Sequence, residues 1–435
     1  MAGTEEPLRR ELRRWRSAKG SAPFPYDAVV RHLRGVGKHF LSPELLDLLD
    51  SCRPALAERT VDGDGDGDHG DTYLAGFLDV LLDKYDDRYD YPSYTALPLL
   101  RHRAPGPQDD WRAWRRWRDR LVLLLLADLI EFEQKVLDGA PSDPQGSLPS
   151  PALLGKRLRL AVRVMEPAAL RILDHAVDAV AVAATPGRTP VTPLAAAVLT
   201  TADADERLLL RTSLHPVYVL HDEYLFLRVL QAFETTFSFM ARTLDAAVRV
   251  LHGEQPGDAA TLLASVADVL RESLPLFSLL ATMQPESFQV FRQYTEGASA
   301  IQSEGYKTFE SYCSTPARAR LESSAFTSVP RVREAVLAGR DTVQGAWEDV
   351  LASGWLSDRD AAAVRAAAGQ LEAVHQRWKQ THYRLAARMI GERSGTGSTE
   401  GVPYLRSVMT NRLFPAVGQP APASRPAFEQ QPAAS

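Results

Sequence analysis

The sequence predicts an all-α fold. Several long stretches carry apolar residues at three- and four-residue spacing, which is the period of an amphipathic helix. We find neither a strand-hairpin pattern nor an internal repeat. Stretches rich in proline, glycine and serine or threonine, at residues 140–151 and 185–193, separate helical segments. Such stretches form loops or domain boundaries, and the second is the better candidate for a boundary.

The composition is that of a soluble globular protein, with 435 residues of which 45% are hydrophobic and 24% charged. A net charge of −5 argues against nucleic acid as the main partner. The N-terminus lacks the apolar core of a signal peptide, and the longest apolar run, residues 121–126, is far shorter than the ~20 residues that span a bilayer. Two cysteines, Cys52 and Cys313, cannot form a disulfide framework. We therefore expect a cytoplasmic protein that binds neither nucleic acid nor membranes.

Residues 1–60 have the pattern of N-terminal helices, with Leu8, Leu12 and Trp15 on one side and arginines on the other. The arginines could bind nucleic acid, but the overall acidity favours a solvated face. Residues 61–71, VDGDGDGDHGD, resemble a calcium loop, yet Tyr73 stands where the closing glutamate is expected. We expect a flexible acidic linker there, with calcium binding as the alternative.

Residues 72–193 form a further predicted helical region. Helices are expected within 72–98, at 111–138 and at 153–184. The stripe of Trp111, Trp114 and Trp117 indicates a helix–helix contact rather than a cofactor site. Residues 194–414 form the next predicted domain, and the Pro-, Ala- and Ser-rich tail at 415–435 is expected to be disordered.

A long helix is predicted at residues 221–251, with an apolar side that includes Phe226, Leu230 and Phe233. A second helix follows His375, with Trp378 and His382 on its inward face, and ends at Gly391. The glycines beyond it, at 395, 397 and 401, allow close approach of the backbone. An imidazole beside such a loop indicates a ligand held between helix and loop. The alternative is a hydrogen-bonded core histidine.

Three segments of the second half of the chain carry motifs. The helix at 221–251 begins HDEYLFLRVLQAFE, and residues 288–303 read FQVFRQYTEGASAIQS. His382 is followed by RMIG at 388–391, GTG at 395–397 and YLR at 404–406. In this order the segments resemble motifs of the tryptophan 2,3-dioxygenase family, namely HDExLFIxxHQAYELW, FxxFRxYLxPASGFQS and the C-terminal signature from its histidine to YLR. The resemblance covers residues 208 to about 414.

The resemblance implies a helical bundle of the tryptophan 2,3-dioxygenase type, with an additional N-terminal helical region and haem b as cofactor. It implies that His382 is the proximal ligand of the haem iron and that 194–414 is the haem-binding catalytic domain. The other residues that it assigns are Phe226 and Phe288 as walls for the aromatic substrate, Arg292 on the substrate carboxylate, Ser299 near the haem propionates or the substrate amine, Thr396 on the amino-acid portion, and Gly395 and Gly397 beside the cofactor.

The chain departs from the family at Leu230, where the family has a second, distal histidine. Leucine can neither accept nor donate a proton, so no general base is available at this catalytic position. We expect a more apolar distal pocket and a substrate that need not present an N–H there. The run at 72–98 weakly resembles the family's YLxLDxLL helix, which reaches into a neighbouring subunit's pocket, but the match assigns no residue.

The main hypothesis is a haem-dependent oxygenase that inserts oxygen from O2, or from a peroxide, into tryptophan or a related aromatic amino acid. The loss of the distal histidine fits a role in secondary metabolism, and the family implies a homo-oligomer, either dimer or tetramer. The first alternative is a non-catalytic haem-binding or haem-sensing protein. The second is a helical scaffold without a cofactor.

Overall fold

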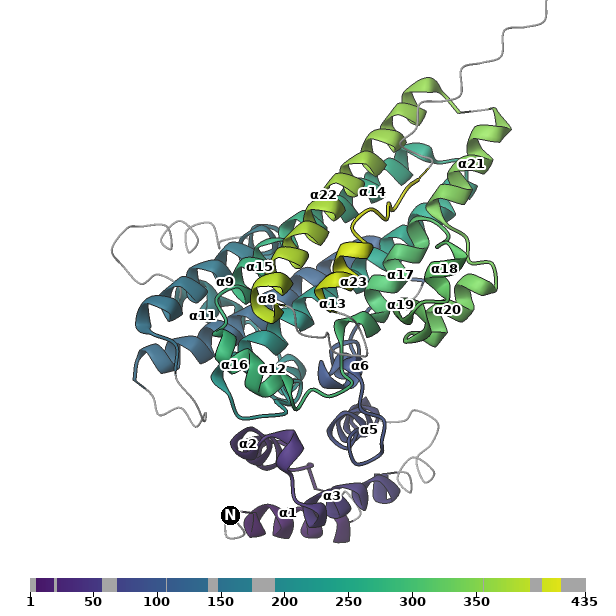
Figure 1. Ribbon diagram of the computed structural model, residues 1–435. Coiled ribbons are helices and arrows are strands. Elements are labelled where there is room, and N and C mark those ends of the chain that lie inside the picture. The colour runs from purple at the N-terminus through teal and green to yellow at the C-terminus, as the bar shows by residue number, and fades with distance from the viewer. Residues whose placement is uncertain are drawn as a thin grey trace, which may run out of the picture.

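The computed structural model describes residues 5–18, 22–56, 69–106, 108–139, 148–173, 192–354, 356–391 and 401–415. In these segments every regular element is a helix, which confirms the all-α prediction (Figure 1). The N-terminal half contains α1 (Glu6–Ser17), α2 (Tyr26–Val36), η2 (Lys38–Phe40), α3 (Pro43–Asp50), α5 (His69–Leu81), α6 (Tyr91–Tyr94), α7 (Leu97–Leu100), α8 (Trp111–Leu137), α9 (Pro151–Ile172), α11 (Thr192–Thr200) and α12 (Ala204–Thr212).

The second half of the chain continues this series of helices. It contains α13 (His221–His252), α14 (Pro256–Ser273), α15 (Pro275–Leu280), α16 (Pro285–Arg292), η3 (Ala300–Gln302), α17 (Glu304–Cys313), α18 (Arg318–Leu321), α19 (Ser324–Thr327), α20 (Pro330–Leu337), α21 (Val343–Ser353), α22 (Asp358–Ile390) and α23 (Val402–Ser407). The predicted helix at 221–251 is confirmed as α13. The predicted end at Gly391 is confirmed as well, because this glycine follows α22 with a φ of 64°.

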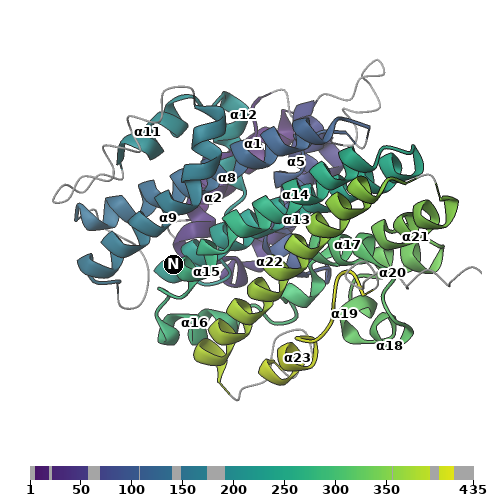
Figure 2. The ribbon, with the colours of Figure 1, turned by 90° about the horizontal axis from the view of Figure 1, so that it is seen from above.

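Helix α13 is the centre of the bundle. It packs against α8, α14 and α17, and α14 packs in turn against α22. Figure 2 shows α13, α14 and α22 running side by side. Most residues of α13 are buried, on all sides of the helix, as expected of a helix enclosed by others. Because α8 contacts both α13 and α9, the predicted N-terminal region and the second half share one core.

Several predicted segments lie wholly or partly outside the described residues. These are residues 61–68 of the acidic linker, 416–435 of the tail, and 174–191, which include the end of the predicted helix at 153–184 and most of the boundary at 185–193. Among the helices that are described, we find none with the length and apolar character of a membrane span.

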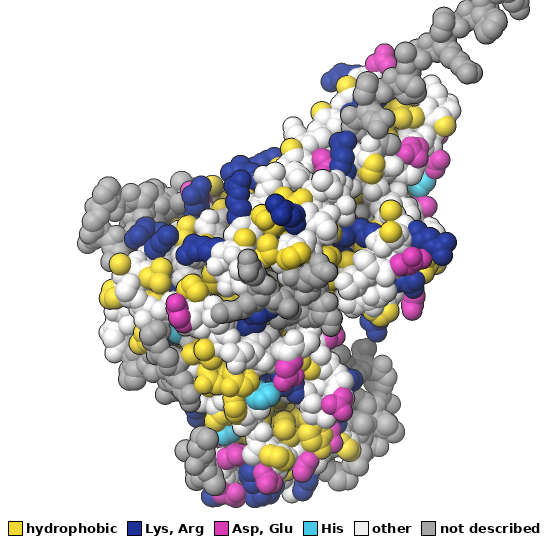
Figure 3. Space-filling model, in the orientation of Figure 1, with side chains coloured by type: hydrophobic (Ala, Val, Ile, Leu, Met, Phe, Trp, Pro, Cys, Tyr) yellow, Lys and Arg dark blue, Asp and Glu magenta, His cyan; other side chains and the backbone are white. Residues whose placement is uncertain are grey.

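Two arginines of α1 form ion pairs at the surface. Arg9 lies 2.9 Å from Glu5 and Arg13 lies 3.2 Å from Glu6. In the space-filling view, acidic and basic side chains are interspersed over this lower end of the molecule (Figure 3). This arrangement supports the interpretation of the arginine side as a solvated face.

A network of buried charges holds the start of α13. Arg157 of α9 donates to Glu133 Oε1 of α8 at 3.0 Å and to Asp222 Oδ1 of α13 at 2.6 Å. His221 Nε2 lies 2.9 Å from Glu133 Oε2. All four side chains are at most 3% exposed. Buried charges are tolerated only when they are paired, so this network fixes α13 relative to α8 and α9.

We predict that Arg157→Ala lowers the free energy of unfolding by about 3–5 kcal/mol, because Glu133 and Asp222 would remain buried without their cation. Arg103 is the control, since its pair with Asp203 is about half exposed on both sides. Arg103→Ala should cost less than about 1 kcal/mol. Urea unfolding followed by circular dichroism measures both. Equal losses for the two variants would contradict the assigned role of the network.

Candidate functional site

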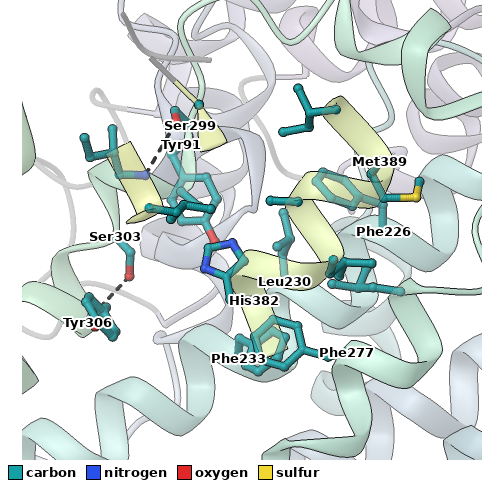
Figure 4. Close-up of a pocket in the computed structure, with 18 of the residues that line it drawn as sticks. Tyr91, Phe226, Leu230, Phe233, Phe277, Ser299, Ser303, Tyr306, His382 and Met389 are labelled. Carbon is teal, nitrogen blue, oxygen red and sulfur yellow. Dashed lines mark hydrogen bonds between the residues drawn. The ribbon is translucent and has the colours of Figure 1, made fainter. Parts of the chain in front are cut away.

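One cavity brings together helices from both halves of the chain. Its volume is about 280 Å³, near the lower end of the ~300–1,000 Å³ range of small-molecule sites. Helices α13, α16 and α22, the segment from η3 to α17, and α6 contribute to its walls (Figure 4). Its lining is mostly apolar and aromatic, and includes Phe226, Phe233, Phe277, Leu280, Phe288 and Met389.

His382 projects from α22 into this cavity (Figure 4). Its ring stacks on Phe277, with centroids 5.7 Å apart, and lies 5.3 Å from the ring of Trp378. Neither ring nitrogen has a hydrogen bond to any residue that the structure describes. Burial lowers the pKa of His382 to about 4, so the imidazole is neutral at physiological pH. A neutral, unpaired imidazole is the form that ligates a metal.

His375 provides the contrast on the same helix. Its Nε2 lies 2.9 Å from the hydroxyl of Tyr306, and the side chain is 3% exposed. Burial lowers its pKa to about 3. His375 is therefore a hydrogen-bonded core histidine. That alternative was open for His382, but the described contacts do not support it.

The wall formed by α13 and α16 is aromatic. Phe226 is half-buried on α13, with its ring 5.7 Å from Phe288 and 5.3 Å from Phe291 on α16. Leu230, one turn further along α13, also lines the cavity. These rings exclude water and offer edge-to-face contacts to a flat ligand. The sequence analysis did not predict that Phe291 lines the site, although an aromatic residue in the same motif as Phe288 was a signal for it.

Arg292 and Ser299 also line the cavity. Arg292 ends α16, one turn after Phe288, so both side chains lie on one face of the helix. Ser299 begins η3, and its hydroxyl oxygen accepts from Ile301 N at 3.5 Å. The predicted residues Phe226, Leu230, Phe288, Arg292, Ser299 and His382 thus surround one space. Thr396, Gly395 and Gly397 lie outside the described residues.

Two tyrosines of the N-terminal half complete the cavity. Tyr91 and Tyr94, at the two ends of α6, both line it. The Tyr91 hydroxyl donates to Glu234 Oε1 at 3.2 Å and the Tyr94 hydroxyl to Glu223 Oε1 at 3.1 Å. Burial raises the pKa of Glu234 and raises that of Glu223 to about 8. The only sequence signal for these tyrosines was the weak resemblance of this region to a pocket-entering helix.

A cationic group of residues lies at another part of the cavity wall. Lys307 of α17 and Arg320 of α18 flank Glu310. Burial alone would raise the pKa of Glu310, but the two cations lower it to about 2. Burial lowers the pKa of Lys307 to about 8. The sequence carried no motif for this group, because its members come together only through packing.

The residues present fit haem. In the described parts of the chain, no three His, Cys, Asp or Glu side chains are grouped as ligands for a bare metal ion. One unpaired imidazole could instead hold an iron whose remaining ligands a porphyrin supplies. Apolar walls suit the faces of such a ring, and Lys307 and Arg320 suit its carboxylates.

Comparison with known proteins gives related enzymes. No family model matches the chain. A protein of Nocardioides sp. is 30% identical over 222 residues, which are 45% of this chain and 82% of that protein. A protein of Anaeromyxobacter sp. (strain K) is 29% identical over 224 residues, with 84% of its length covered, and one of Bordetella pertussis is 27% identical over 236 residues, with 83% covered. Each of the three is a tryptophan 2,3-dioxygenase.

Proposed function

Because the chain belongs to the tryptophan 2,3-dioxygenase family, we propose that it is a haem-dependent oxygenase that inserts oxygen into tryptophan or a related aromatic amino acid. The observation that carries this proposal is the unpaired, neutral imidazole of His382 in an apolar cavity. His382 is its proximal iron ligand. Haem, when bound, supplies the site at which O2, or a peroxide, is activated.

The chain's own residues bind and orient the substrate. Arg292 forms a bidentate pair with the substrate carboxylate, because the planar guanidinium matches two carboxylate oxygens. Phe226 and Phe288 hold the aromatic ring and exclude water from it. Ser299 contacts the amine or the propionates. Thr396 contacts the amino-acid portion, with Gly395 and Gly397 beside the cofactor.

Leu230 separates this chain from a member with a distal histidine. An isobutyl group at this position cannot hold or move a proton, so Leu230 takes no proton from the substrate ring. We infer a substrate that has diverged from tryptophan and a place in secondary metabolism. The alternative of a haem sensor without turnover rests on the same Leu230, but Arg292 and Phe288 favour a substrate pocket.

We also propose that the protein is cytoplasmic and homo-oligomeric, either dimer or tetramer. The thiols of Cys52 and Cys313 are both buried and free, which supports a reducing compartment.

We predict that His382→Ala abolishes haem retention, because His382 supplies the one imidazole among the described residues that line the cavity. The absorption spectrum of the purified protein measures this through its Soret band. His375→Gln is the matched control, since this histidine lies on the same helix but is bonded to Tyr306. It should keep the band. A normal haem spectrum in His382→Ala would disprove the ligand assignment.

We predict that Arg292→Ala keeps haem but weakens binding of the amino-acid substrate by about 10- to 100-fold, the effect of losing a charge-assisted contact. Titration with tryptophan, tyrosine and their derivatives, followed by the shift of the Soret band, measures the affinity. Gln293→Ala, at the exposed neighbouring residue, should bind like the unaltered protein. An unchanged affinity of Arg292→Ala for the amino acid would contradict the proposal that Arg292 binds the substrate carboxylate.

We predict that the protein binds L-tryptophan and 1-methyl-L-tryptophan with similar affinity, because Leu230 makes no hydrogen bond to the ring nitrogen. Leu230→His should change the ratio of the two affinities by about 2- to 10-fold in favour of L-tryptophan, which is the contribution of one hydrogen bond. Leu230→Met keeps the site apolar at similar volume and should leave the ratio unchanged. A strong preference of the unaltered protein for the N–H compound would contradict this assignment.

A further inference from the structure

Lys307 is a buried cation whose ammonium has one long ion pair, with Glu310, and lies near the rings of Tyr306 and Phe326. Lys307 lies on α17 and lines the cavity, and the residue is 3% exposed. The nearest carboxylate oxygen is Glu310 Oε2 at 3.7 Å, beyond hydrogen-bond distance. No hydrogen bond of its ammonium is found among the residues that the structure describes. Removing an ammonium group from water is costly, and an anion closer than Glu310 would reduce that cost.

Glu310 forms only a long ion pair with Lys307, at 3.7 Å, because its carboxylate is hydrogen-bonded to another cation. Arg320 donates from Nε to Glu310 Oε1 at 2.6 Å and from Nη2 to Oε2 at 2.7 Å. This bidentate pair uses both carboxylate oxygens in the geometry that guanidinium prefers. The two cations and one carboxylate leave a net charge of +1 at the cavity wall.

The surroundings of Lys307 favour an anion further. Lys307 lies in the first turn of α17, a helix of ten residues, where the helix dipole is positive. The carboxyl group of Glu234 also lines the cavity, where burial raises its pKa and its Oε1 accepts from the Tyr91 hydroxyl. Ser299 accepts a backbone N–H with its oxygen, which leaves its hydroxyl proton available to an acceptor in the cavity.

Two aromatic rings of the cavity lining connect Lys307 on α17 to His382 on α22. The ring of Trp378 is 5.3 Å from His382 and 5.4 Å from Tyr306, and Lys307 Nζ lies 5.0 Å from the centre of the Tyr306 ring. Arg292 instead belongs to the α16 wall with Phe288. Lys307 and Arg292 therefore lie on different elements of the cavity lining.

We propose that Lys307, with Arg320 beside it, binds a carboxylate at the edge of the porphyrin that His382 ligates. The inference rests on the proposed function, since it requires haem in the cavity. A carboxylate from the amino-acid substrate has the same chemistry, so the test must separate the two sources. The bound carboxylate accepts hydrogen bonds from the Lys307 ammonium and completes the neutralisation of the net charge.

The experiment compares haemin with its dimethyl ester, in which both carboxylates are neutral. Dissociation constants come from absorption titrations of haem-free protein, for the unaltered chain and for Lys307→Met. The unaltered protein should bind haemin about 10- to 100-fold more tightly than the ester, the effect of a charge-assisted hydrogen bond. Lys307→Met should lose most of this preference, and Lys307→Arg should keep it.

Lys379→Met is the matched control. Lys379 lines the same cavity, but its ammonium donates to the backbone carbonyls of Met409 at 3.0 Å and Asn411 at 2.5 Å. Its loss should change the affinities for haemin and ester by the same factor. Thermal unfolding of haem-free Lys307→Met provides an independent measurement. Its midpoint should rise, because a buried charge is replaced by an apolar side chain of similar length.

Two results would overturn the inference while haem binding persists. In the first, Lys307→Met retains the full preference for haemin over the ester and has a lower unfolding midpoint. A lysine with only a structural role would behave in this way. In the second, Lys307→Met binds haemin normally but loses the spectral response to the amino acid. The carboxylate that Lys307 binds would then belong to the substrate and not to the porphyrin. Failure of the unaltered protein to bind haemin at all would overturn the proposed function and this inference together.

Discussion

The cavity depends on a set of charges that never reach solvent. Arg157, Glu133, Asp222 and His221 connect α9, α8 and the first turn of α13, and each is tolerated in the interior only because the others are present. Further along α13, Arg228 lies 2.6 Å from Asp128 of α8 and is fully buried as well. These contacts fix α13, which carries Phe226, Leu230 and Glu234, against rotation about its axis and against sliding along it. Its cavity-facing side chains therefore have a defined position.

Around this fixed helix, the cavity divides its chemistry among three walls. The α22 wall carries a neutral imidazole, the α13 and α16 wall carries aromatic rings and Arg292, and the α17 and α18 segment carries a net positive charge. Each wall suits a different part of a haem–substrate pair: the iron, the flat substrate, and the carboxylates. The apolar lining strengthens all polar contacts inside the cavity, because the local dielectric constant is low.

Helical periodicity was sufficient to predict the fold class, α13 and the end of α22 at Gly391, because one face of each helix is apolar and glycine ends a helix readily. The motifs also identified six residues that line one cavity. Periodicity could not identify Tyr91, Lys307 or Arg320, because it shows which face of a helix is buried and not what that face meets. Asp222 matched a motif without revealing that its partner is Arg157, a residue from a distant helix with no motif of its own.

The position of Tyr91 and Tyr94 has a consequence for the evolution and engineering of the protein. Their hydroxyls are bonded to Glu234 and Glu223 of α13, so the short helix α6 is part of the cavity although it belongs to the N-terminal half. A chimaera that joins residues 194–414 to a different N-terminal region would lose both tyrosine side chains from the cavity wall. It would also leave two buried carboxyl groups without these hydroxyl partners. Directed evolution confined to residues 194–414 would therefore leave two side chains of the cavity wall unvaried.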